Sequence, residues 1–215
     1  MKKMKKSLVL LMSFLFIPIM LIGCSSKPKV SPDETAKILF NFYIKGDQSG
    51  LEKIKMPKDV IDETAKLQKE TYTTAIKNNF KVAGLTIKDE QVEQIYEARM
   101  EGLKKLTVTT ETVSESDTEA QVKIKSTYFD TVALDKKAAQ DAVEQVKKLK
   151  LTNQQEAKTK VTDAYIKNLV EAFKNVKPSA DTKEKTFKFT IQEKVWLPQN
   201  MIQFGSGIGG QVSGM

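Results

Sequence analysis

The side chains that most often carry out chemistry in proteins are scarce in this sequence. Its 215 residues contain no histidine and one cysteine, Cys24. Nucleophiles activated by histidine, zinc sites built from histidine or cysteine, and internal disulfides are therefore excluded. We predict no catalytic residue and no cofactor, and the remaining candidates for chemistry are carboxylates.

One acidic stretch could collect a divalent cation, and its members are Glu111, Glu115, Asp117 and Glu119. The stretch lacks the Asp/Asn spacing and the glycine of a calcium-binding loop. A solvated hairpin turn is the better explanation, so we predict no metal site.

Two pairs of carboxylates, Asp89 with Glu90 and Glu97 with Glu101, could in principle do acid–base work. They lie in a strongly charged helical segment, where a solvated face is the simpler explanation. An enzyme working in the cavity of a sheet would also need an acid at an inward strand position. The alternating positions of 120–124 and 187–191 carry none, so the sequence favours a protein that is not an enzyme.

The cysteine follows the strongest signal in the chain. Lysines at the N-terminus precede an apolar stretch from Leu8 to Ile22. Fifteen residues at 1.5 Å each span about 22 Å, which is short of the roughly 30 Å hydrocarbon core. A cleaved signal peptide at 1–23 therefore fits better than a permanent transmembrane helix.

The sequence Leu21-Ile22-Gly23-Cys24 resembles the bacterial lipobox, with an apolar residue at −3, a small residue at −1 and a cysteine at +1. The resemblance implies that cleavage leaves Cys24 as the N-terminus and that its thiol carries diacylglycerol, whose two chains suffice for stable anchoring. We predict lipidation at Cys24, a polar tether at 24–30, and a location at the extracytoplasmic face of the cell membrane. An ordinary secreted protein is the alternative.

The charge of the chain does not favour nucleic acid as a partner. Removing the four lysines of the signal peptide from the net charge of +8 leaves +4, without a basic stripe in the sequence. The basic residues include one arginine, Arg99. Because arginine is the better bidentate clamp, its scarcity argues against specific anion recognition.

Periodicity and capping signals predict three helices first. One begins at Ser31-Pro32-Asp33-Glu34 and ends at Gly46, a second runs from Pro57 to about 79, and a third covers 87–105. A short helical piece is expected at 51–56.

The pattern then alternates over 106–113 and 120–125, which predicts a hairpin, and again over 185–197, which predicts a late strand. A helical pair at 135–176 is inserted between them. The sequence therefore predicts an α+β fold, with helices packed on one face of a small antiparallel sheet.

The predicted limits are a single α+β domain at 31–204 and a flexible tail at 205–215. The tail holds five of the ten glycines of the chain.

This arrangement resembles uncharacterised lipoproteins of low-GC Gram-positive bacteria with a cystatin-like, or nuclear-transport-factor-two-like, domain. The resemblance covers most of Cys24 to Trp196, and three features carry it: the lipobox, the helix that begins at Ser31 and ends Phe40-Asn41-Phe42-Tyr43-Ile44-Lys45-Gly46-Asp47, and the late strand that closes on Val195-Trp196. It implies a fold and a location, because the family has no assigned activity.

In cone-shaped folds of that superfamily, the space between the first helix and the sheet is sometimes a ligand pocket. We expect a filled core there instead. The aromatic side chains that should meet in this space are Phe40, Tyr43, Phe129, Phe187, Phe189 and Trp196.

The sequence thus favours a lipid-anchored, non-enzymatic domain of the cell envelope that binds an envelope protein or a small ligand, with binding residues unknown. The alternatives are a solute-binding lipoprotein associated with a transporter and, less favoured, a carboxylate-based enzyme.

Overall fold

The computed structural model describes residues 28–214. The predicted signal peptide at 1–23 and the predicted lipidation site Cys24 lie outside these residues. The described elements are α1 (Pro32–Lys45), α2 (Lys58–Val82), α3 (Asp89–Lys104), β1 (Val108–Glu115), β2 (Glu119–Thr127), α4 (Thr131–Lys147), α5 (Gln154–Asn175), β3 (Thr182–Gln192), β4 (Val195–Pro198) and α6 (Met201–Val212).

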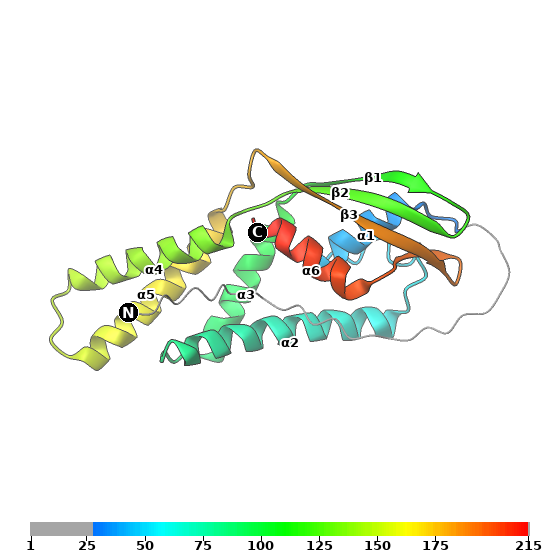
Figure 1. Cartoon of the computed structure of the whole chain (residues 1–215). Helices are drawn as coiled ribbons and strands as arrows, with labels where there is room; N and C mark the ends of the chain where they lie inside the picture. The colour runs from blue at the N-terminus through cyan, green and yellow to red at the C-terminus, as the bar shows by residue number, and fades with distance from the viewer. Residues whose placement is uncertain (1–27, 215) are drawn as a thin grey trace.

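The four strands form one antiparallel sheet in the order β1-β2-β3-β4. Helices α1 and α6 pack on one face of it, and the α4–α5 pair is inserted between β2 and β3 (Figure 1). The predicted α+β class, the hairpin and the helical insertion are therefore confirmed.

Alternation along the strands gives the sheet one apolar and one solvated face. Ala120, Val122 and Ile124 of β2 are buried against the helices. The opposite face carries ion pairs between neighbouring strands, which are Lys123–Glu111 at 2.9 Å, Lys125–Glu184 at 3.2 Å and Lys188–Glu119 at 2.7 Å. Opposite charges facing each other across strands stabilise the pairing modestly and keep this face in water.

The first helix begins and ends where its capping residues predict. The Ser31 hydroxyl accepts a hydrogen bond from the backbone N–H of Glu34 at 3.3 Å, and Pro32 occupies the first turn. Gly46 ends the helix with φ of 67°, a left-handed conformation that favours glycine.

The predicted flexible tail at 205–215 is wrong, because residues 201–212 form helix α6. Asn200 caps it by accepting a hydrogen bond from the N–H of Gln203 at 3.0 Å. Phe204, Ile208 and Val212 lie one helical turn apart and are almost completely buried. The domain therefore extends beyond the predicted limit at 204.

Glycine allows α6 to lie directly against β3. A Cβ at Gly207 would lie 2.7 Å from Cε1 of Phe187, which is closer than real Cβ atoms approach. The buried side chain of Gln211 donates to the carbonyl oxygens of Lys183, at 2.7 Å, and of Ile124, at 3.2 Å. Close packing and two hydrogen bonds thus join this helix to the sheet.

Two shorter predictions are also corrected. Residues 51–56 form consecutive turns and no helix, although Leu51 and Ile54 are buried in them. The late strand is divided into β3 and β4 by a two-residue turn at Glu193 and Lys194, whose φ angles of 49° and 65° are both left-handed. Such turns match the twist of a hairpin but break the run of extended residues.

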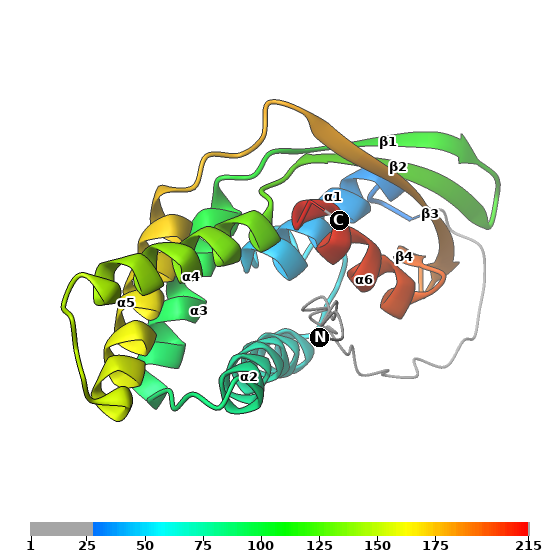
Figure 2. The same ribbon diagram turned by 60° about the vertical axis from the view of Figure 1, so that its left-hand side comes forward.

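The molecule is elongated. Both Figure 1 and Figure 2 show the α4–α5 loop at one end. The β3–β4 turn and the first described residues lie at the other end. Helix α2 packs against α3 beneath the sheet layer. Pro28, the first described residue, therefore lies at the end opposite the helical hairpin.

Candidate functional site

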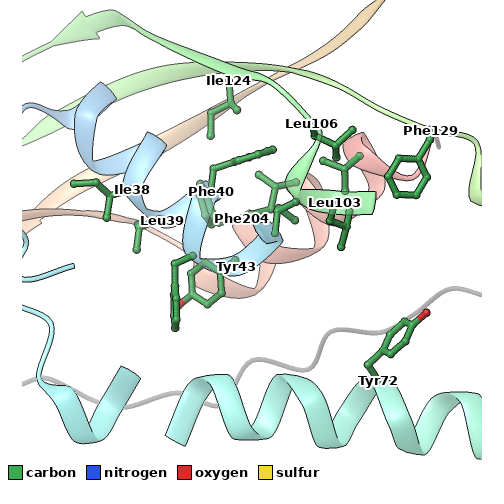
Figure 3. Packing of buried hydrophobic residues seen from close by; sticks show 14 of the residues in the cluster. Ile38, Leu39, Phe40, Tyr43, Tyr72, Leu103, Leu106, Ile124, Phe129 and Phe204 are labelled. Carbon is green, nitrogen blue, oxygen red and sulfur yellow. The ribbon is translucent and has the colours of Figure 1, made fainter. Parts of the chain in front are cut away.

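The space between α1 and the sheet is filled with side chains, as the sequence predicts. Phe204 of α6 lies with its ring centre 5.0 Å from Phe187, 5.9 Å from Phe189 and 6.4 Å from Tyr43. Figure 3 shows Phe40 and Phe204 close together in this core. Burial raises the pKa of Tyr43 to about 12, because ionisation would place a charge among apolar groups. Phe129, which the sequence also predicts in this space, instead packs its ring against Phe173 of α5 at 6.3 Å.

Two residues of the acidic stretch are paired with lysines of the sheet. Glu111 and Glu119 point to the solvated face of the sheet and pair with Lys123 and Lys188. Lys123 holds the pKa of Glu111 below its usual value through a hydrogen bond and its charge. In residues 28–214 no three carboxylate, cysteine or histidine side chains lie close enough together to hold a metal ion.

The paired carboxylates of α3 lie on the outside of the molecule. Asp89 makes an ion pair with Lys77 of α2 at 2.8 Å, and Glu90, Glu97 and Glu101 are exposed. This arrangement supports ion pairing between α2 and α3.

Arg99 is buried between α2 and α3, with its guanidinium carbon 4.5 Å from the centre of the Tyr72 ring. Burial raises the pKa of Tyr72, and the nearby arginine opposes that rise. The cation–π contact gives this charge a partner in a dehydrated site. We therefore interpret Arg99 as part of the α2–α3 packing.

Two surface hollows flank the segment at 28–32, where the described chain begins. One, of about 230 Å³, lies towards the β1–β2 turn, and Glu115, Asp117 and Trp196 line it. The other, of about 260 Å³, contains no acidic side chain. We call the second one the basic hollow, and its lining residues are Pro28, Lys29, Val30, Lys53, Lys55, Lys194 and Val195.

The basic hollow combines lysines from three segments that are far apart in the sequence. Lys29 precedes α1, Lys53 and Lys55 lie in the turns before α2, and Lys194 lies in the β3–β4 turn. Lys53 pairs with Glu34 at 3.0 Å, and both side chains are about half exposed. Because no single segment is strongly basic, sequence reasoning missed this site.

Comparisons with known proteins support the fold and leave the site unassigned. The sequence matches no protein-family profile and no curated protein. The structure is similar to the crystal structure of ycdA, a predicted lipoprotein from Bacillus subtilis, with a TM-score of 0.61 and 16% sequence identity. The match covers 84% of this chain and 55% of the other, so this chain spans about half the length of that protein.

At this level of identity, the likeness shows a shared α+β fold and does not transfer an activity. The assignment to a cystatin-like superfamily is not decided by it and stays a prediction.

Proposed function

We propose that this chain is a lipid-anchored, non-enzymatic binding domain at the extracytoplasmic face of the cell membrane. The position of Cys24 carries the proposal: the only cysteine of the chain stands at the one position where the lipobox pattern requires it. The likeness in fold to a predicted lipoprotein supports the same kind of protein.

The spacing between Cys24 and the folded domain also supports an anchor. Only Ser25, Ser26 and Lys27 separate Cys24 from Pro28. Helix α1 begins at Pro32 and its residues Ala36 and Leu39 belong to the core. The lipid would therefore hold the domain close to the bilayer surface. Within residues 28–214, no helix has the length and apolar composition needed to span a bilayer.

A binding role fits the described side chains better than catalysis does. The inner face of the sheet presents apolar residues, and its outer face presents carboxylates paired with lysines. The hollows lie at the surface, beside the start of the domain. A surface of this kind suits a macromolecular partner, and the transporter-associated alternative has no separate observation in its favour.

Replacing the cysteine tests the anchor. Cells that produce Cys24→Ala should accumulate an uncleaved precursor that incorporates no labelled fatty acid, whereas the wild type should be cleaved, labelled and extracted into detergent. A Ser26→Ala variant is the matched control and should behave as the wild type does. Labelling of Cys24→Ala, together with membrane fractionation after a high-salt wash, would refute the assignment.

A further inference from the structure

The basic hollow lies at the point where the chain leaves the domain towards its proposed lipid. Pro28 and Val30 are part of its lining. Cys24 is four residues before Pro28, and a fully extended chain covers at most about 3.6 Å per residue, so the two lie within about 14 Å. A lipid on Cys24 would thus bring the hollow to the level of the phospholipid headgroups.

Three of the four lysines are outside the ion pairs of the described residues. Within the described part of the chain, Lys29, Lys55 and Lys194 make no ion pair, whereas Lys53 pairs with Glu34. The exposed Glu52 and Glu193 neighbour these lysines in sequence, but neither lines the hollow. The hollow therefore presents a concentrated positive charge in a domain of small overall charge.

The other side of the same segment has the opposite character. Glu115 and Asp117, in and beside the β1–β2 turn, line the neighbouring hollow, and Lys29 lines both hollows. An anionic surface would attract the side with four lysines more strongly than the side with two acids and one lysine. This arrangement can select one orientation of the domain, which uniformly scattered lysines could not do.

Two of the lysines have a left-handed backbone, which the acidic Glu193 shares at φ of 49°. Lys55 and Lys194 have φ of 56° and 65°, a region in which asparagine and glycine are less strained. Lys150, in the α4–α5 loop, has the same conformation at φ of 51°. What distinguishes Lys55 and Lys194 is that they converge on one hollow.

We propose that the basic hollow binds anionic phospholipid headgroups of the membrane that holds the lipid of Cys24. The inference rests on the proposed anchoring. An acyl anchor and a cluster of basic residues act together, because each lysine near an anionic surface strengthens binding by about fivefold. The lipid fixes the domain to the membrane, and the hollow fixes its orientation. The α4–α5 loop, at the opposite end in Figure 1, then points away from the bilayer.

Vesicle binding of a chain without lipid tests the hollow independently of the anchor. A chain beginning at Ser25 keeps the whole described core, because the buried hydrophobic cluster begins at Ala36 and the first residue packed against it is Val30. Binding is measured to vesicles of phosphatidylcholine with about one third phosphatidylglycerol, and to vesicles of phosphatidylcholine alone. The site variant changes Lys29 and Lys53 to Gln, and Lys55 and Lys194 to Asn, which suits their left-handed backbone.

The matched control removes four lysines from the opposite end of the molecule. It changes Lys147, Lys148 and Lys160 to Gln and Lys150 to Asn; all four are exposed and lie around the α4–α5 loop. The net charge of both variants is the same. Circular dichroism melts establish that both are folded before binding is compared.

The expected result is binding of the wild type to the anionic vesicles only, weakened by raising the salt to about 0.5 M. Because three of its changed lysines are outside the ion pairs of the described residues, the site variant should bind on the order of 100-fold more weakly. The control should stay within about fivefold of the wild type. Changing Glu115 to Gln and Asp117 to Asn should strengthen binding.

Three outcomes would overturn the proposal: equal loss in the site and control variants, equal binding to neutral and anionic vesicles, or binding to polyglutamate without binding to vesicles. The last would identify an acidic polymer as the occupant. If Cys24 is labelled with fatty acid but the vesicle-binding test fails, the proposal for the basic hollow is refuted and the proposed anchor stands. If the chain binds anionic vesicles but Cys24 is not labelled in cells, the proposed anchor is refuted and the binding of the hollow to lipid stands.

Discussion

Replacing single glycines of α6 by alanine tests how this helix joins the sheet. Gly207 and Gly210 lie in the same helix, but a Cβ at Gly207 would meet Phe187 at 2.7 and 2.8 Å, whereas a Cβ at Gly210 would meet nothing within 4 Å. Replacement by alanine therefore raises helix propensity equally at both positions, by up to about 1 kcal/mol. Only at Gly207 does it also overpack the core.

The clash at Gly207 has no easy relief. The ring of Phe187 is buried and lies 5.0 Å from Phe204, so moving it disturbs the centre of the core. Overpacking of this kind costs about 1–3 kcal/mol. We expect Gly210→Ala to raise the free energy of unfolding by up to about 1 kcal/mol, and Gly207→Ala to lie about 1–3 kcal/mol below Gly210→Ala.

Urea and thermal unfolding of the two variants beside the wild type measure the difference. For a chain of this size, 1 kcal/mol corresponds to about 2–4 °C in Tm. Gly209→Ala is a second control, because a Cβ there also has open space. If Gly207→Ala and Gly210→Ala agree within about 0.5 kcal/mol, α6 does not pack against β3 as described.

Three further predictions concern the same core and its surroundings. Phe189→Ala should lower the free energy of unfolding by about 3–5 kcal/mol in urea melts, since its ring is fully buried; a loss below 1 kcal/mol would contradict the sheet packing. The pKa of Tyr43, about 12 in the folded chain against 10.0 when unperturbed, predicts a contribution to stability that is present below about pH 10 and lost as pH rises through 12. Between pH 10 and 12, the free energy of unfolding of Tyr43→Phe should therefore fall by up to about 2–3 kcal/mol less than that of the wild type. The same fall in stability with pH in both proteins would refute this. EDTA should leave Tm unchanged, and a fall of several degrees would revive the acidic stretch as an ion site.

Much of this fold could be predicted from local patterns. Ser31 and Gly46 mark the ends of α1, and alternation at 120–124 identifies β2. Helix α6 was not predicted, because the high glycine content of 205–215 indicates a flexible segment. The spacing of Phe204, Ile208 and Val212, behind the cap at Asn200, was the signal that could have found it.

The candidate site was beyond reach for a different reason. Lys29, Lys55 and Lys194 become neighbours only after the turns before α2 and the β3–β4 turn meet beside the start of α1. Each stands among residues of mixed charge in the sequence. Convergence of distant single charges is a property of the tertiary structure, so periodicity and motif spacing do not report it.

Helix α6 follows all four strands in the sequence, which bears on the order in which the described residues can fold. During synthesis, the β1–β2 hairpin and the α4–α5 pair can form early, because their contacts are local. Strand β3 can pair with β2 only after the whole helical pair has been made, and Phe204 follows all four strands in the sequence. A chain interrupted before Asn200 would expose the apolar face of its sheet, together with Phe187 and Phe189, to aggregation. The burial of Phe187 and Phe189 against Phe204 therefore has to wait until α6 has been made.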